Sequence, residues 1–83
     1  MSSKARVILY TRPGCHLCDE AKAEMIAAGC ADEYLLEEVN IDTDPSLKEA
    51  YGSEIPVIYI NGTKAFKYRL TAADFKRRIR RRS

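Results

Sequence analysis

Two cysteines separated by two residues, Cys15 and Cys18, are the side chains best suited to chemistry in this sequence. They follow an apolar run at residues 7–10 and the turn Pro13-Gly14, and they lead into a helix-like run that continues to residue 28. The start of a helix carries unpaired N–H groups and partial positive charge, which favour the thiolate form of cysteine. Because the thiolate attacks disulfides and binds metals, this spacing predicts thiol chemistry.

The predicted helix distinguishes the two thiols. Four small or apolar residues recur at helical spacing and predict one buried face: Cys18, Ala21, Met25 and Ala28. The helix should run from about residue 15 to residue 28 and end at Gly29. Cys18 then points inward, while Cys15 stays accessible at the mouth of the helix. Such a pair suits thiol–disulfide exchange, with Cys15 attacking and Cys18 resolving.

The other elements follow from periodicity and turn residues. Predicted strands are residues 6–10, 34–41, 57–60 and 63–68, and predicted helices are residues 15–28, residues 45–51 and the segment after residue 71. Asp44 before Pro45 is a typical helix start, the Thr71 to Asp74 segment has the capping-box pattern, and a hairpin signal, Asn-Gly, stands at 61–62.

This order of elements constrains the sheet. The first two strands are joined by a helix, so they must be parallel with a right-handed crossover, whereas the hairpin makes the last two antiparallel. The sequence therefore predicts an α/β fold ordered β-α-β-α-β-β-α, in which helices flank a four-stranded mixed sheet.

Length and composition restrict the class of protein. The 83 residues, 46% hydrophobic and 31% charged, suit one domain over residues 1–83. No stretch reaches the roughly 18 apolar residues of a membrane span, and the first residues lack a secretory-signal pattern, so we expect no membrane association and a cytoplasmic location. Three cysteines are an odd number, too few for a disulfide scaffold.

Charge is distributed unevenly along the chain. Residues 1–63 hold 5 Lys and Arg against 11 Asp and Glu, whereas residues 64–83 hold 9 against 1. The basic C-terminal end, residues 76–83, could pair with phosphates of nucleic acid or with an acidic partner. The other interpretation is that its cations complement the dipole of the last helix and aid solubility. Because no nucleic-acid-binding signature accompanies them, we expect no nucleic-acid partner.

Three local features make the sequence similar to the glutaredoxins over nearly its full length. The first is residues 10–18, Tyr-Thr-Arg-Pro-Gly-Cys-His-Leu-Cys, which resemble the strand, basic residue and Cys-x-x-Cys site of that family. The second is Ile-Pro-Val at residues 55–57, and the third is the hairpin at 61–62. The resemblance implies a thioredoxin-like fold and a dithiol–disulfide oxidoreductase that reduces protein or glutathione mixed disulfides.

Residues around the thiols have predicted roles as well. The resemblance implies that Pro56 is cis and turns the backbone N–H and C=O of Ile55 toward a cleft, where an extended peptide or glutathione would pair with them. It also matches Arg12 to a basic position that helps hold glutathione and favours the thiolate; the alternative is a solvated loop arginine. A charged imidazole at His16 would stabilise the thiolate, and the alternative is a ring that points to solvent.

The sequence departs from the glutaredoxin pattern at two places. Leu70-Thr71 stand where glutathione-binding members carry Gly-Gly before the last helix, and Asp74 matches the acidic position that follows only loosely. His16-Leu17 replace the Pro-Tyr often found between the cysteines. The chain therefore resembles a divergent glutaredoxin-like group.

Two other functions remain open. A metal or iron–sulfur cluster carrier would use the same thiols, although Cys15 and Cys18 supply only two ligands and no second pair completes a zinc site. A non-catalytic adaptor would use the fold and the basic C-terminal end. We predict no metal site and no bound cofactor, a monomer, and a disulfide-containing protein or glutathione as partner. Cys30 lies too far along the chain to join the pair, and we expect it to be buried rather than a spare thiol.

Overall fold

A computed structural model describes residues 4–81; residues 1–3 and 82–83, with Arg82 of the basic C-terminal end, lie outside the described part. The strands are β1 (Ala5–Thr11), β2 (Tyr34–Asn40), β3 (Val57–Ile60) and β4 (Thr63–Lys67). The helices are α1 (His16–Ala27), α2 (Pro45–Tyr51) and α3 (Ala72–Arg80), and short 3-10 turns cover Ala31–Glu33 and Ile41–Thr43. The predicted order of strands and α-helices is confirmed.

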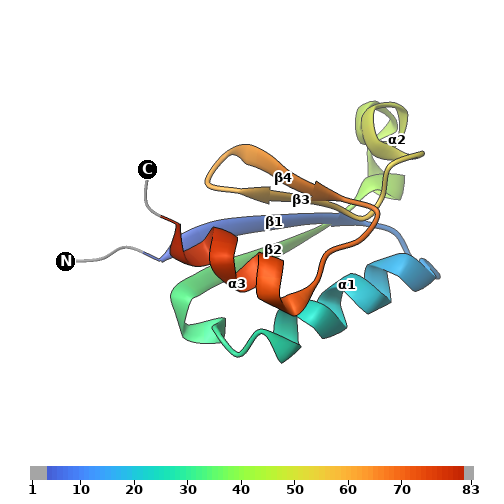
Figure 1. The fold of residues 1–83 in the computed structure, drawn as a ribbon. Helices are drawn as coiled ribbons and strands as arrows, with labels where there is room; N and C mark the ends of the chain where they lie inside the picture. The colour runs from blue at the N-terminus through green and yellow to red at the C-terminus, as the bar shows by residue number, and fades with distance from the viewer. Residues whose placement is uncertain (1–3, 82–83) are drawn as a thin grey trace.

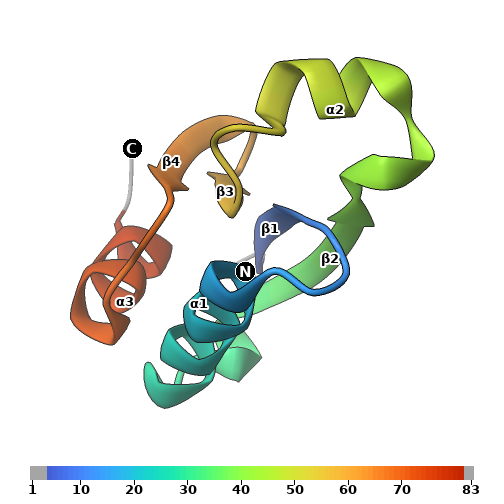
Figure 2. The same ribbon diagram turned by 90° about the vertical axis from the view of Figure 1, so that its right-hand side faces the viewer.

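The four strands form one mixed sheet in the order β2-β1-β3-β4. β1 and β2 are parallel, and β3 is antiparallel to both β1 and β4. Helices α1 and α3 cover one face of the sheet, whereas α2 lies at the opposite face (Figures 1 and 2). The predicted α/β fold with a four-stranded mixed sheet flanked by helices is therefore correct.

The hydrophobic core fills the space between the sheet and the two helices α1 and α3. Leu9 and Ile58 reach it from the two central strands, and Phe75 and Met25 reach it from the helices. Leu9, Ile58 and Phe75 have no exposed surface. Burial of this kind contributes roughly 1.5–3 kcal/mol for each large apolar side chain. The core therefore fixes α1 against β1, which joins it through the short segment that carries Cys15.

The turns form where the residue types predict them. Asn61 and Gly62 have φ angles of 51° and 82°, the left-handed backbone that a tight hairpin requires and that Asn and Gly adopt at low cost. Asp44 caps α2 by accepting the N–H of Ser46 at 2.8 Å. These local signals hold because each depends on a few neighbouring residues.

Several boundaries, each by one residue, and one cap differ from the prediction. β1 extends one residue further at each end than residues 6–10, and α1 is one residue shorter at each end than residues 15–28. Ile41 begins a 3-10 turn instead of ending β2, and it is fully buried. β4 ends at Lys67 rather than at residue 68. Thr71 accepts the N–H of Asp74 at 3.2 Å, but Asp74 bonds to Arg77 and does not complete the capping box.

Within residues 4–81, the longest helix is α1 with 12 residues, and none of the helices is long and apolar enough to cross a membrane.

Candidate active site

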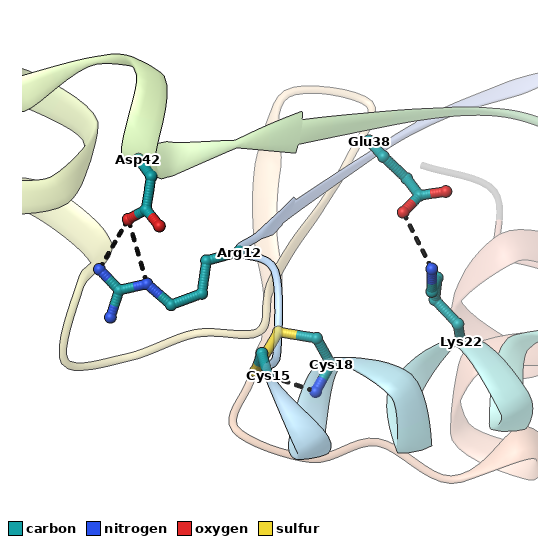
Figure 3. Close-up of a disulfide and its surroundings, with 6 residues drawn as sticks. All are labelled: Arg12, Cys15, Cys18, Lys22, Glu38 and Asp42. Atoms are coloured by element: carbon teal, nitrogen blue, oxygen red, sulfur yellow. Dashed lines mark hydrogen bonds and ion pairs between the residues drawn. A yellow bond between two sulfur atoms is a disulfide. The ribbon is translucent and has the colours of Figure 1, made fainter.

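Cys15 and Cys18 lie at the start of α1, directly after the turn that follows β1. Gly14 makes this turn with a φ of 76°. Cys15 is the N-cap residue of α1, with extended backbone, and its Sγ accepts the N–H of Cys18 at 3.2 Å. The two cysteines form a disulfide, with their Cα atoms 5.2 Å apart (Figure 3). The redox-capable pair is thus held by the helix itself, and an N–H of the first turn points at the sulfur of Cys15.

The two sulfurs differ in their access to solvent. Cys15 is half-buried, whereas Cys18 is only 1% exposed and lies on the inner face of α1 with Ala21 and Met25. The predicted inward face of the helix is therefore confirmed. This arrangement leaves Cys15 as the sulfur of the pair that a second molecule can reach.

Arg12 lies beside the pair, but its guanidinium points away from the disulfide toward Asp42 (Figure 3). Its Nε and Nη2 donate to the same Oδ1 at 3.2 and 2.8 Å, and both side chains are about a third to two fifths exposed, at 35% and 42%. The backbone C=O of Arg12 accepts the N–H of Cys15 at 3.3 Å. Arg12 therefore braces the loop through its backbone while Asp42 offsets its charge.

Asp42 is a site residue that the sequence analysis did not single out. The 3-10 turn after β2 holds it, because the Oδ1 of Asn40 accepts the N–H of Asp42 at 2.9 Å. The sequence does predict the turn that holds Asp42, because the side chain of Asn commonly accepts the backbone N–H of the residue two positions later. The partner of Asp42 lies 30 residues earlier, which no local pattern reveals.

His16 occupies the first turn of α1 on its outer side. Its side chain is 89% exposed, and its Nε2 lies 3.2 Å from Oε2 of Glu20, one turn along the helix. A protonated imidazole here would share its charge with that carboxylate. His16 directly follows Cys15 in the sequence, but its ring points to solvent and to Glu20.

Ile55 and Pro56 lie directly before β3, at the end of the sheet where β1 ends. The peptide bond between them is cis, as the resemblance implied. Tyr10 of β1 pairs with Val57 of β3 in the antiparallel register. Pro56, next to Val57, therefore lies at the same end of the sheet as the loop that carries the cysteines. Pro56 is fully buried and its C=O accepts the N–H of Tyr68 at 2.9 Å. Among residues 4–81, the backbone N–H and C=O of Ile55 have no hydrogen-bond partner, so both are available to an added strand.

The segment before α3 contains the residues that replace Gly-Gly. Leu70 is buried in the core, at 7% exposure, and Thr71 is the N-cap of α3. The N–H of Ala72 donates to Oε1 of Glu24 on α1 at 2.8 Å. This segment is therefore held against α1 by both packing and a charged hydrogen bond to a helix N-terminus.

A groove of about 450 Å³ runs between α1 and the segment from β4 to α3. Leu17, Glu20 and Glu24 line it from α1, and Tyr68 and Asp74 line it from the other side. The sequence analysis missed this groove, because its two walls come from segments roughly fifty residues apart and meet only in the folded chain.

Three tyrosines pack together where α2 meets the sheet. Tyr10 stacks on Tyr51 with ring centroids 4.4 Å apart, and Tyr51 donates its hydroxyl to that of Tyr59 at 3.1 Å. That hydrogen bond, together with burial, raises the pKa of Tyr51 to about 12. Tyr10 is half-buried in this cluster, which fixes α2 to the end of the sheet near Arg12 and Asp42.

Within residues 4–81, no group of three or more His, Cys, Asp or Glu side chains is arranged to hold a metal ion. A cluster held by Cys15 and Cys18 would need its further ligands from outside this part of the chain. Cys30 is 2% exposed within the core, as expected, and burial raises the pKa of its thiol.

Comparisons with known proteins agree with this geometry. Residues 6–80 match the family described as "Glutaredoxin-like domain (DUF836)". A crystal structure of the structural genomics target XcR50 from X. campestris is 30% identical, with a TM-score of 0.74 over 84% of this chain and 89% of that one. The solution structure of Ne2328 from Nitrosomonas europaea is 25% identical, with a TM-score of 0.78 over 95% of both chains. A malarial protein, 19% identical with a TM-score of 0.65 over 88% of this chain and 90% of that one, shares the fold.

Proposed function

The chain belongs to the glutaredoxin-like domain family, and we propose that it is a thiol–disulfide oxidoreductase that reduces protein or glutathione mixed disulfides. The observation that carries this proposal is the asymmetry of the pair. Cys15 caps a helix and is half-buried, whereas Cys18 lies one turn behind it with 1% of its surface exposed. An accessible sulfur backed by a sheltered one is what two-step disulfide exchange needs.

In the first step the thiolate of reduced Cys15 attacks one sulfur of the substrate disulfide. The substrate S–S bond breaks, the other substrate sulfur leaves as a thiolate that takes up a proton, and Cys15 is joined to the substrate in a mixed disulfide. The N–H of Cys18 points at the Sγ of Cys15, at 3.2 Å, and stabilises negative charge there.

In the second step Cys18 loses its proton and attacks the Sγ of Cys15. The mixed disulfide breaks, the second substrate thiol is released, and the Cys15–Cys18 disulfide forms. Two electrons have then passed from the pair to the substrate. The second substrate sulfur takes up the proton that Cys18 loses, and the first takes its proton from the solvent. A small thiol such as glutathione, acting as co-substrate, would return the protein to the dithiol by the reverse exchange.

The neighbouring residues have proposed roles in binding and in tuning. The unpartnered backbone N–H and C=O of Ile55, next to the cis bond to Pro56, would pair with the extended backbone of the substrate. Arg12 and His16 would modulate the thiolate through charge, each in competition with the acidic partner it has in the structure, Asp42 for Arg12 and Glu20 for His16.

Two substitutions test the proposal. Cys15→Ser should abolish the reduction of a protein disulfide and of a glutathione mixed disulfide. Cys18→Ser should instead accumulate a mixed disulfide with the substrate, visible by mass spectrometry as one added substrate chain at Cys15. Cys30→Ser serves as the matched control and should retain turnover. If wild type reduces neither substrate faster than Cys15→Ser does, the oxidoreductase proposal is wrong.

A further inference from the structure

We propose that the groove between α1 and the β4–α3 segment binds the part of a protein substrate next to its disulfide cysteine, and that it selects a segment carrying Lys or Arg. The inference rests on the oxidoreductase function proposed above. It narrows the substrate from protein or glutathione disulfides to protein disulfides with a basic flank.

The groove begins at Leu17, in the first turns of α1, and follows one face of that helix. Leu17, Glu20, Ala21 and Glu24 line it, and these positions are three, four and seven residues apart, so they form one stripe along the helix. Leu17 stands between the two cysteines in sequence. The stripe spans about 10 Å at 1.5 Å per residue, which is the length of roughly three extended residues. A peptide whose cysteine is bound at Cys15 could therefore place its next few residues in this groove.

The opposite wall of the groove carries three apolar or aromatic side chains and is connected to the cis-proline segment. Phe66, Tyr68 and Leu70 line it. Tyr68 is 44% exposed and holds a φ of 68°, and its N–H donates to the C=O of Pro56 at 2.9 Å. The exposed ring of Tyr68 offers apolar contact area to a ligand in the conformation that the structure shows. The aliphatic stem of Lys or Arg can cover this surface while its charged end stays at the rim.

The charges around the groove are mainly negative. Of the described residues, Glu20, Glu24 and Asp74 line it, against one cation, Arg69. Arg77 pairs with Asp74 at 2.8 Å and offsets much of its charge. The two glutamates are therefore the groups that would attract a cation.

Among residues 4–81, neither glutamate forms an ion pair with a lysine or arginine. The partner of Glu20 is His16, which is charged only if protonated. Glu24 accepts the N–H of Ala72 through Oε1, and among the described residues its Oε2 has no hydrogen-bond partner. Two carboxylates along one stripe of α1, the helix that begins at the thiols, therefore give the groove an anionic rim.

The cation on the other side of the thiols does not reverse this preference. Asp42 holds the guanidinium of Arg12 at 2.8 Å, away from the disulfide (Figure 3). Glutathione carries two carboxylates and one amino group, so it is an anion at neutral pH. Like charges across a binding surface disfavour the wrong partner, and opposite charges accelerate the right one. The surroundings of Cys15 thus favour a basic peptide over glutathione.

The test uses three peptides of equal length that carry one cysteine in mixed disulfide with 2-mercaptoethanol and have Lys, Gln or Glu at the two residues after that cysteine. Single-turnover reduction by the reduced protein should be about tenfold faster for the Lys peptide than for the Glu peptide at low salt. At high salt the ratio should fall to about threefold or less, because screening weakens the attraction.

Substitutions locate the preference in the groove. Replacing Glu20 and Glu24 together by Gln keeps the volume and the acceptor for the N–H of Ala72 but removes both charges. The Lys to Glu rate ratio should then fall to about threefold or less even at low salt. Glu49→Gln, an exposed acid on α2 at the opposite face of the sheet, is the matched control and should keep the full ratio.

Binding separates this inference from the proposed function. The same peptides with Ser in place of Cys, labelled for fluorescence anisotropy, should bind in the order Lys, Gln, Glu. Equal binding of the Lys and Glu peptides, or a preference that survives both glutamate substitutions, would overturn the groove as a cation-selective site. Selective binding without reduction of any disulfide would support the groove and contradict the oxidoreductase function.

Discussion

Asp42 determines where the charge of Arg12 is used. Its carboxylate receives two hydrogen bonds from the guanidinium and is itself positioned by Asn40. The backbone C=O of Arg12 accepts the N–H of Cys15, so the arginine remains attached to the cysteine loop whatever its side chain does. Release of the side chain would therefore return a cation to the neighbourhood of the thiols.

Asp42→Asn tests this arrangement. Loss of the carboxylate charge should free the guanidinium and favour the thiolate of reduced Cys15, raising its alkylation rate at neutral pH by about threefold. The rate is measured with iodoacetamide, with the alkylated residue identified by mass spectrometry. Asp44→Asn is the matched control, because Asn also caps a helix well and Asp44 lies at the start of α2. A rate that stays the same or falls would show that Arg12 does not act on the thiols.

Cys30 gives the stability of the protein a pH dependence. Burial first, and then the nearby charge of Glu33, raise the pKa of its thiol in the folded state above the value of about 8.5 in an unfolded chain. The folded state therefore holds the proton more tightly. The resulting stabilisation is fully present below about pH 8.5 and is lost as the pH rises toward the folded pKa.

Cys30→Ala should remove this alkaline loss. In the oxidised protein, the free energy of unfolding of wild type should fall between about pH 8.5 and 10 by at most about 1.4 kcal/mol per pH unit, the limit for one proton. The variant should be flatter over the same range in urea unfolding curves. Tyr51→Phe is the control that should keep most of the slope there, because the stability loss from Tyr51 falls between the unfolded pKa of tyrosine, about 10, and its folded pKa of about 12. Parallel curves for wild type and Cys30→Ala would contradict the assignment.

The start of α3 connects the fold to the groove. Thr71 caps this helix, and Glu24 of α1 takes the N–H of Ala72, so two acceptors satisfy the first turn. Leu70, just before the cap, is buried in the core. At these two positions, where the sequence departs from the Gly-Gly of the glutaredoxin pattern, packing of Leu70 and capping by Thr71 fix the segment.

Thr71→Ala should destabilise the protein by about 1 kcal/mol, because the N–H of Asp74 loses its acceptor at the helix start. The measurement is the midpoint of urea unfolding at unchanged m-value. Thr71→Ser retains the hydroxyl and should stay within about 0.5 kcal/mol of wild type. If the alanine and serine variants unfold at the same midpoint, the cap contributes nothing measurable.

The core decides the stability of the whole chain, because a domain of 83 residues has one modest core. Phe75 has no exposed surface and packs edge-on against Tyr34, with ring centroids 5.1 Å apart. It joins α3 to the sheet and thereby fixes the wall of the groove that precedes that helix. Loss of this ring would affect both stability and the site.

Phe75→Ala should cost about 3–5 kcal/mol, which is a large part of the 5–15 kcal/mol typical of small domains. The expected result is a large shift of the urea midpoint and partial unfolding at physiological temperature. Ile26→Ala is the control, since Ile26 is also a large apolar residue on a helix but is 77% exposed, and it should change stability by no more than about 0.5 kcal/mol. Similar losses for the two variants would contradict the proposed role of the core.

Folding pairs some of the cations of the basic C-terminal end with acidic residues elsewhere in the chain. Arg80 forms hydrogen bonds with both carboxylate oxygens of Glu33, the shortest at 2.8 Å, and this contact lowers the pKa of Glu33. Arg77 pairs with Asp74. Two cations of the basic C-terminal end are therefore engaged within the molecule, while Arg78 is half-buried and Arg81 is exposed. The basic C-terminal end serves at least partly to tie α3 to the turn before β2.

Much of this protein was readable from short stretches of sequence. The hairpin at 61–62, the caps at Asp44 and Thr71, and the buried stripe that contains Cys18 each depend on residues within about one helical turn of each other. Backbone preference and the helical period act over that range, so residue types alone predict them. The order of elements then restricts the sheet to few topologies, which is why the mixed sheet was predicted correctly.

The contacts that shape the site join residues far apart in the chain. Arg12 meets Asp42 across 30 residues, and Glu24 meets the N–H of Ala72 across 48. Each contact depends on how helices and strands pack and on which rotamers that packing leaves free, and no periodicity records either of these. The partner of Arg12 and the groove between α1 and the β4–α3 segment therefore emerge only when the separated segments are folded against one another.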